Sequence, residues 1–132
     1  MEKTLYDKNG KSVAYIFNDY QGTIFLWEGV PVAYLYEDIH LYGINGKHLG
    51  FFIDEIIYDN NGFRQGFTTS SCPVPVGKEE GKPKREPVDE LRSRWDAPPM
   101  ANLTFNFSDR DFSDFLADGQ VERTLFGSEI EQ

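Results

Sequence analysis

The first seventy residues repeat one short pattern four times, and this repeat constrains the fold more than any other feature of the chain. Each copy has an aliphatic–aromatic pair, a turn, a glycine and, four residues later, a small residue followed by an aromatic one. The copies run from Leu5 to Tyr15, Leu26 to Tyr34, Leu41 to Phe51 and Ile57 to Phe67. Asn-Gly pairs favour tight turns because both residues tolerate positive φ. We therefore predict four β-hairpins, the second with a tighter turn because its glycine follows its aromatic residue two positions sooner.

Alternation along the second strand of each hairpin predicts which side chains share a face. One face would carry Ser12, Pro31, His48 and Arg64 with the small residues Ala14, Ala33, Gly50 and Gly66. The other face would carry Val13, Val32, Leu49 and Gln65 with Tyr15, Tyr34, Phe51 and Phe67. A ring of four small residues predicts a crowded place where backbones approach one another around a pseudo-fourfold axis. Closure of the hairpins would also remove exposed sheet edges.

This order of hairpins resembles the bacterial four-fold β-flower domain family. The resemblance rests on the repeated glycine-plus-aromatic spacing, from Tyr6 to Tyr15 in the first copy to Tyr58 to Phe67 in the last, and it covers roughly the first half of the chain. It implies four hairpins around a pseudo-fourfold axis and brings no activity to particular residues. The expected fold class is mainly β, with a short α/β C-terminal tail packed on the repeated hairpins.

The composition changes after the repeats, and we divide the chain accordingly. Residues 1–71 form the four-hairpin repeat domain, residues 72–90 a Pro- and charge-rich extended linker, residues 91–126 a docking tail, and residues 127–132 a frayed end. The linker has little apolar surface to bury, so we expect it to be the most mobile segment.

The docking tail has two predicted elements. Alternation of Leu103, Phe105 and Phe107 predicts a short strand, and a short helix is predicted near 109–118, from a Ser108–Asp111 capping box to Asp118-Gly119. A helical turn is expected at 89–95. The apolar residues expected to be buried when the tail docks are Trp95, Leu103, Phe105, Phe107, Phe112, Phe115 and Leu116. Docking in cis is the leading hypothesis, with exchange between subunits as the alternative.

The net charge, the single cysteine and the apolar segments limit the binding partners and the cellular location that the sequence predicts. The net charge is -9 and there is no basic face, so nucleic acid and anionic membranes are disfavoured. The single cysteine, Cys72, allows no intrachain disulfide and lacks the neighbours of a reactive thiol. A strand pattern follows Met1 directly, with no signal-peptide run, and no apolar stretch approaches the roughly 20 residues that span a bilayer. We expect a cytoplasmic protein of bacterial type.

Three polar residues occupy equivalent positions in different hairpins: Ser12, His48 and Arg64. If the hairpins converge, these residues could meet near the axis and bind a small anionic ligand, since Arg offers a planar fork to a carboxylate. The alternative is that each faces solvent at a hairpin edge. His40 and His48 are eight residues apart and match no standard metal-ligand spacing. No metal, other cofactor or catalytic residue is predicted.

The aromatic residues have two interpretations. Tyr6, Trp27, Tyr42 and Tyr58 could line a groove at one level, but a domain of about 70 residues needs most of its aromatic residues in the core. The repeats and the lack of catalytic motifs favour a non-enzymatic binding or protein-interaction module. One alternative is a small hydrolase-like enzyme with a polar site around Ser12, His48 and Arg64, and another is a structural homo-oligomer.

Overall fold

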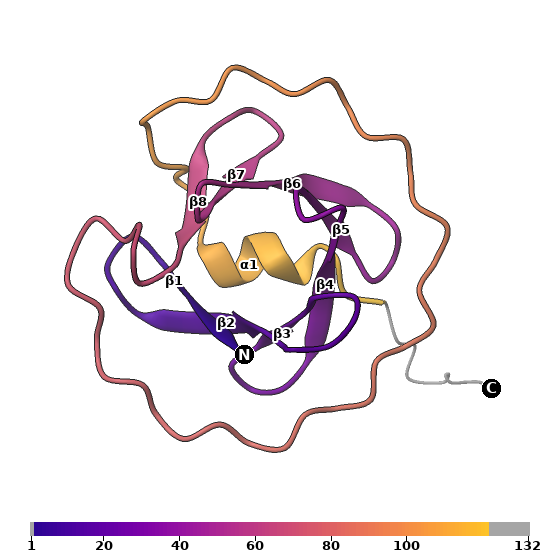
Figure 1. The fold of residues 1–132 in the computed structure, drawn as a ribbon, viewed down its shortest axis with the longest axis horizontal. Coiled ribbons are helices and arrows are strands. Elements are labelled where there is room, and N and C mark those ends of the chain that lie inside the picture. The colour runs from indigo at the N-terminus through magenta and orange to yellow at the C-terminus, as the bar shows by residue number, and fades with distance from the viewer. Residues whose placement is uncertain (1, 122–132) are drawn as a thin grey trace.

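The repeated hairpins close into a barrel of eight antiparallel strands (Figure 1). The structure is a computed structural model that describes residues 2–121. The strands are β1 (Lys3–Tyr6), β2 (Ser12–Ile16), β3 (Thr23–Leu26), β4 (Pro31–Tyr36), β5 (His40–Gly43), β6 (His48–Ile53), β7 (Ile56–Asp59) and β8 (Arg64–Phe67). Each strand pairs with the next, and β8 pairs with β1 through Tyr6 and Phe67. The predicted mainly-β fold of four hairpins is confirmed.

All four hairpin turns have the same length, so the prediction of a tighter second turn was wrong. In the first turn Gly10 N–H donates to the Asp7 carbonyl at 3.0 Å, and in the second Gly29 N–H donates to the Leu26 carbonyl at 2.8 Å. Leu26, the last residue of β3, therefore corresponds to Asp7, at which the first turn begins. The pair equivalent to Leu5 and Tyr6 is Ile24 and Phe25, and the apolar character of Leu26 and Trp27 misled the alignment.

A β-bulge in each hairpin rearranges the predicted faces. In the first hairpin Leu5 pairs with Ala14 and Tyr6 with Ser12, so Val13 is an extra, unpaired residue. The same shift recurs in the other three hairpins. Because a bulge interrupts the two-residue alternation, the bulge residues turn toward the barrel core rather than toward the aromatic face. Val32 and Leu49 are buried in that core and Val13 packs against it; Gln65 is the fourth residue of this set.

The four small residues face the core side of the barrel, where space is short. Ala14 and Ala33 are fully buried there. A Cβ on Gly50 would collide with the Tyr58 carbonyl on the neighbouring strand, and one on Gly66 would collide with the ring of Phe112. Crowding therefore comes from a neighbouring strand at Gly50 and from an aromatic side chain at Gly66, rather than from four converging backbones.

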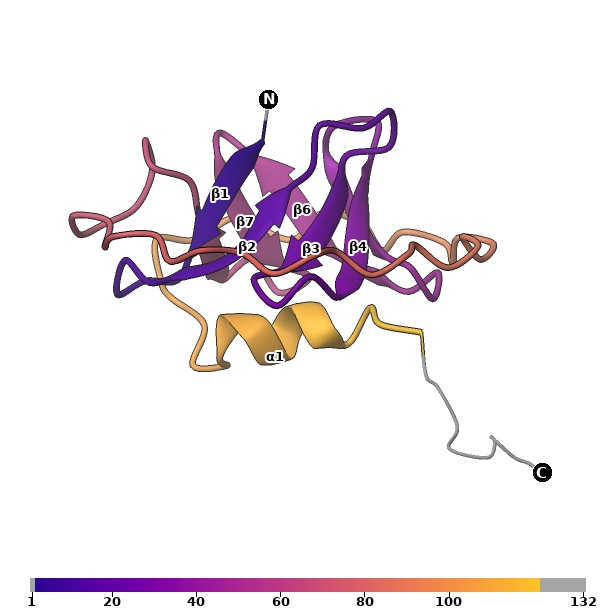
Figure 2. The same ribbon diagram turned by 90° about the horizontal axis from the view of Figure 1, so that it is seen from below.

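Residues 72–108, which we call the girdle, encircle the barrel at the level of the hairpin turns (Figures 1 and 2). The girdle contains no helix or named strand and donates one backbone hydrogen bond to the glycine of each turn. These bonds run from Gly77 to Gly10, from Glu86 to Gly29, from Trp95 to Gly46 and from Thr104 to Gly62, at 2.8, 2.8, 2.9 and 3.0 Å. The donors are evenly spaced along the girdle. The segment expected as a linker, 72–90, is thus extended and is bonded to the first two hairpin turns, and the rest of the girdle continues past the other two.

Cationic side chains of the girdle lie over aromatic rings on the outside of the barrel. The Arg94 guanidinium is 3.8 Å from the centroid of Tyr36, Arg85 is 3.9 Å from Phe17, and the Lys82 ammonium is 4.2 Å from Tyr15. Such cation–π contacts contribute about 0.5–1 kcal/mol each at exposed sites. The cations of the girdle therefore cover the rings of Tyr15, Phe17 and Tyr36 on the outside of the barrel.

Helix α1 (Phe112–Ala117) lies across one end of the barrel (Figure 2). Its buried side chains Phe112, Phe115 and Leu116 belong to the barrel core, as predicted, and it packs on the barrel of its own chain. The N-cap is Asp111, whose carboxylate accepts from the backbone N–H groups of Ser113 and Asp114, rather than Ser108. Within the described residues no helix is long and apolar enough to cross a membrane.

The other expectations for the tail were only partly met. In place of a strand at 103–107 there is a single parallel bridge between Arg64 and Phe107, and no helical turn forms at 89–95. The girdle's large apolar side chains were expected to be buried, yet Phe105 is 85% and Trp95 58% exposed. They remain exposed because the girdle docks through backbone groups and cations. The predicted frayed end, 127–132, lies outside the described residues.

Candidate functional site

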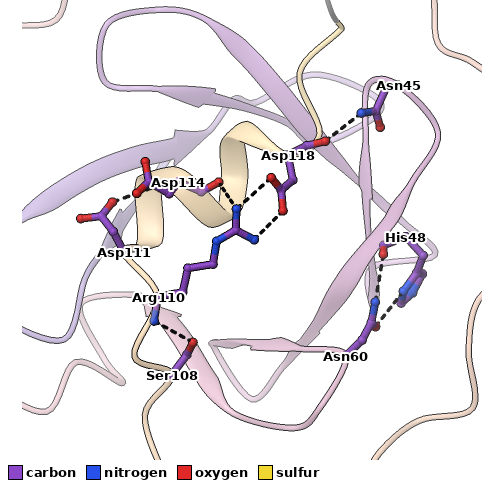
Figure 3. Close-up of polar contacts among 8 residues, drawn as sticks. All are labelled: Asn45, His48, Asn60, Ser108, Arg110, Asp111, Asp114 and Asp118. Carbon is purple, nitrogen blue, oxygen red and sulfur yellow. Dashed lines mark hydrogen bonds and ion pairs between the residues drawn. The ribbon is translucent and has the colours of Figure 1, made fainter.

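A polar hollow of about 470 Å³ lies beside α1, between the turns of the third and fourth hairpins. Its walls come from β6, the β7–β8 hairpin, the girdle and α1, so it forms only when the tail is docked. Figure 3 shows some of its polar lining residues, His48, Asn60, Ser108, Arg110 and Asp118, with nearby hydrogen-bonding groups. The lining residues are Lys47, His48, Leu49, Asp59, Asn60, Asn61, Gln65, Trp95, Ser108, Arg110, Phe115 and Asp118.

Gln65 is the polar exception at the bulge position, which Val13, Val32 and Leu49 hold in the other hairpins. Its side chain is only 4% exposed, and its Oε1 has no hydrogen-bond partner among the residues that the structure describes. The same side chain also lines a smaller hollow of about 220 Å³ shared with Arg64 and Phe112. A buried acceptor without a donor costs about 1–3 kcal/mol.

Two other buried polar atoms lack partners in residues 2–121, and both have a different environment. They are Tyr15 Oη and Trp27 Nε1. The ammonium of Lys82 lies 4.2 Å from the Tyr15 ring centroid and 5.1 Å from that of Trp27. Both rings take part in the cation–π contact of the girdle, and Trp27 also lines a hollow of about 630 Å³ at the first turn.

His48 is fixed by hydrogen bonds that determine its tautomer. Asn60 Nδ2 donates to the His48 carbonyl, so Asn60 Oδ1 faces the ring and accepts from His48 Nδ1–H at 2.9 Å. His48 Nε2 is then an acceptor and receives the proton of His40 Nδ1 at 3.0 Å. Burial lowers the pKa of His48, against the Asn60 bond that raises it. The ring is therefore a neutral wall of the hollow.

Arg110 and Asp118 form a bidentate ion pair across α1 (Figure 3). Arg110 Nη1 lies 2.5 Å from Asp118 Oδ2 and Nη2 lies 2.9 Å from Oδ1, while Nη2 also donates to the Asp114 carbonyl at 3.3 Å. The hydrogen bond from Arg110 lowers the pKa of Asp118. Asn45 Nδ2 donates to the Asp118 carbonyl at 2.8 Å and so ties the end of the helix to the third hairpin.

The structure places the three predicted site residues in different surroundings. His48 lines the hollow of about 470 Å³ beside α1, and Arg64 lines the hollow of about 220 Å³. Gln65 lines both. Arg64 stacks on Phe105, 4.7 Å from the ring centroid, and donates to the Thr104 carbonyl at 3.2 Å. Ser12 is half-buried and lines a third hollow, of about 630 Å³, beside Trp27 and the first turn.

The described residues contain no cluster of side chains that could bind a metal ion. Among residues 2–121 no group of three His, Cys, Asp or Glu side chains is close enough together to hold a metal ion. The His40–His48 pair has its facing nitrogens joined by a hydrogen bond.

Sequence reasoning missed Gln65, Asn60, Arg110 and Asp118 as residues of one site. A signal for Gln65 was present, because it is the polar member of an otherwise apolar repeat position. Arg110 and Asp118 gave no comparable signal, since their place beside the hairpins depends on how the girdle returns α1 to the barrel.

One comparison with known proteins gives a match. The model of the 4-fold beta flower protein family matches residues 3–116. The match extends beyond the hairpins through the girdle and into α1, so it covers more of the chain than the repeats that suggested the resemblance. No curated protein and no solved structure matches the chain.

Proposed function

The chain belongs to the 4-fold beta flower protein family, and we propose that it is a non-enzymatic binding module whose ligand occupies the hollow beside α1. The observation that carries the proposal is the Gln65 carboxamide, a buried acceptor without a partner in residues 2–121 on the wall of that hollow. An apolar residue of similar size would satisfy the packing, as Leu49 does at the equivalent position. Retention of an amide at this cost is understandable if a ligand supplies the missing donor.

The surroundings of Gln65 support a preformed site. His48, Asn60, Arg110 and Asp118 are each held by side-chain hydrogen bonds within the protein, so the walls are fixed before a ligand arrives. A preorganised wall reduces the entropy lost on binding. The volume of about 470 Å³ falls in the range of small-molecule sites.

The test compares small-molecule binding by the full chain and two variants. Saturation-transfer NMR with a mixture of neutral, cationic and anionic polar compounds would be recorded on the wild type, on Gln65→Leu and on Gln21→Leu. Gln21 is exposed in the β2–β3 loop, so its variant makes the same chemical change away from the hollow. We expect a compound that binds the wild type and the control but not Gln65→Leu. Equal binding by all three proteins, or binding by none, would refute the proposal.

A second candidate function, self-association, rests on an exposed apolar patch beside the fourth hairpin. Phe63, Leu103, Phe105 and Phe107 are all exposed there. Exposed clusters of large apolar side chains are typical of interaction surfaces. The occupant we propose is a second copy of this chain, joined through the same patch.

Sedimentation velocity of the full chain tests this second candidate. A dimer that Phe105→Ser converts to a monomer would support it. Tyr20→Ser is the control, because Tyr20 is a fully exposed aromatic residue in the β2–β3 loop, outside the patch. A wild type that remains monomeric at high concentration would refute it.

A further inference from the structure

Three of the four charged side chains on the walls of the hollow beside α1 have hydrogen-bonded partners within the protein. Arg110 is paired by the carboxylate of Asp118, and Asp59 accepts hydrogen bonds from the backbone N–H groups of Asn61 and Phe63 at 2.9 and 3.0 Å. The remaining cation, Lys47, lies 5.9 Å from the ring centroid of Trp95. The walls thus carry two positive and two negative groups. Because these charges balance in number, a charged ligand would lose its hydration here and meet groups of its own sign as well as of the opposite sign.

The unused hydrogen-bonding capacity calls for a group that both donates and accepts. Gln65 Oε1 is an acceptor that lacks a donor among the described residues. Ser108, which lines the same hollow, accepts from the Arg110 backbone N–H at 3.1 Å through its oxygen, which leaves the hydroxyl proton to donate. A hydroxyl group is one donor and two acceptors, so a ligand hydroxyl can serve both residues.

The rest of the lining is apolar or aromatic. Leu49 and Phe115 contribute buried apolar surface, and the exposed indole of Trp95 stands at the rim. Aromatic and apolar side chains beside a few placed polar groups are characteristic of small-ligand sites. A sugar ring combines hydroxyl groups at its edge with apolar C–H faces, which fits this division of the walls.

We infer that the hollow beside α1 takes a neutral polyhydroxyl ligand, a mono- or disaccharide, with one hydroxyl donating to Gln65 and accepting from Ser108. This inference rests on the proposed binding function and adds the class of ligand. The neutral His48 ring and the paired Arg110 disfavour the small anion that the sequence suggested for Ser12, His48 and Arg64.

The test is an NMR titration of the full chain with matched sugars. Glucose and maltose are the neutral probes, and glucuronate and glucosamine differ from glucose by one charged group each. We expect glucose or maltose to shift the amide signals of Gln65, Ser108 and Trp95. Gln65→Leu and Ser108→Ala should each weaken this binding at least tenfold, and Gln21→Leu should leave it unchanged.

The results distinguish a wrong ligand class from a wrong binding site. If only charged compounds bind in a Gln65-dependent way, the saccharide inference is wrong and the proposed function stands. If saccharides bind equally well to Gln65→Leu, or if no compound of any charge binds, both are wrong.

Discussion

The backbone N–H of Trp95 donates a 2.9 Å hydrogen bond to the carbonyl of Gly46, and an equivalent bond joins the girdle to the glycine of every other hairpin turn. The residues that meet each turn from the girdle side differ in type: they are Pro75, Lys84, Ser93 and Asn102. Since these contacts use main-chain atoms, the girdle can follow the fourfold repeat of the barrel without repeating its own side chains.

Replacing Gly46 by alanine should therefore be costly. Gly46 has φ +96°, and its added Cβ would overlap the carbonyl oxygen of Ser93. Together, the unfavourable φ and the displaced girdle should lower the free energy of unfolding by about 2 kcal/mol or more, measured by urea denaturation. The matched control is Gly81→Ala, because nothing lies within 4 Å of a Cβ there. Equal stability of the two variants would show that the girdle is not held at this turn.

Gln65→Leu should raise stability by about 1 kcal/mol, because it removes a buried acceptor without a partner in the described structure and restores the apolar residue found at Leu49. Thermal and urea unfolding of Gln65→Leu and Gln21→Leu would measure the difference. A clear loss of stability in Gln65→Leu would mean that the amide supports the fold rather than a ligand.

The sequence was sufficient to predict the four hairpins, because their glycine spacing and their alternation are local signals. It could not reveal the bulges at Val13, Val32, Leu49 and Gln65. A bulge moves a residue to the other face of the strand, and no particular residue type marks its position. Helix α1 was predictable from Phe112, Phe115 and Leu116. The candidate site was not, because Arg110 and Gln65 come together only through the path of the girdle.

Gly66→Ala should destabilise the protein by about 1–3 kcal/mol through overpacking, because the new Cβ would collide with the Phe112 ring. A double-mutant cycle with Phe112→Leu isolates this contact. The smaller side chain leaves room for the methyl group, so the double variant should lose less stability than the sum of the two single variants. Additive losses would show that Gly66 and Phe112 are not in direct contact.

Stability should fall below neutral pH because of His48. Burial lowers its pKa in the folded protein, whereas the unfolded chain has the ordinary histidine pKa of about 6.5. The unfolded state therefore binds more protons, and the free energy of unfolding decreases as the pH falls from about 6.5 toward the lowered pKa. Urea denaturation at several pH values should show this decrease in the wild type and a flatter profile in His48→Gln. Identical profiles for the two proteins would place the pH dependence elsewhere.

Two truncations should separate the contribution of the girdle from that of α1. A chain ending at Asp109 keeps the girdle but loses Phe112, Phe115 and Leu116, all of them buried in the barrel core. Each such side chain is worth about 1.5–3 kcal/mol when buried, so this chain should expose apolar surface, bind a hydrophobic dye and unfold at lower temperature. A chain ending at Ser71 also loses the backbone bonds to the four turn glycines and the cations over the outer aromatic rings. It should therefore be the less stable of the two and aggregate. If the chain ending at Ser71 stays soluble, monomeric and as stable as the full chain, the barrel needs neither element, and the tail would be available for a partner.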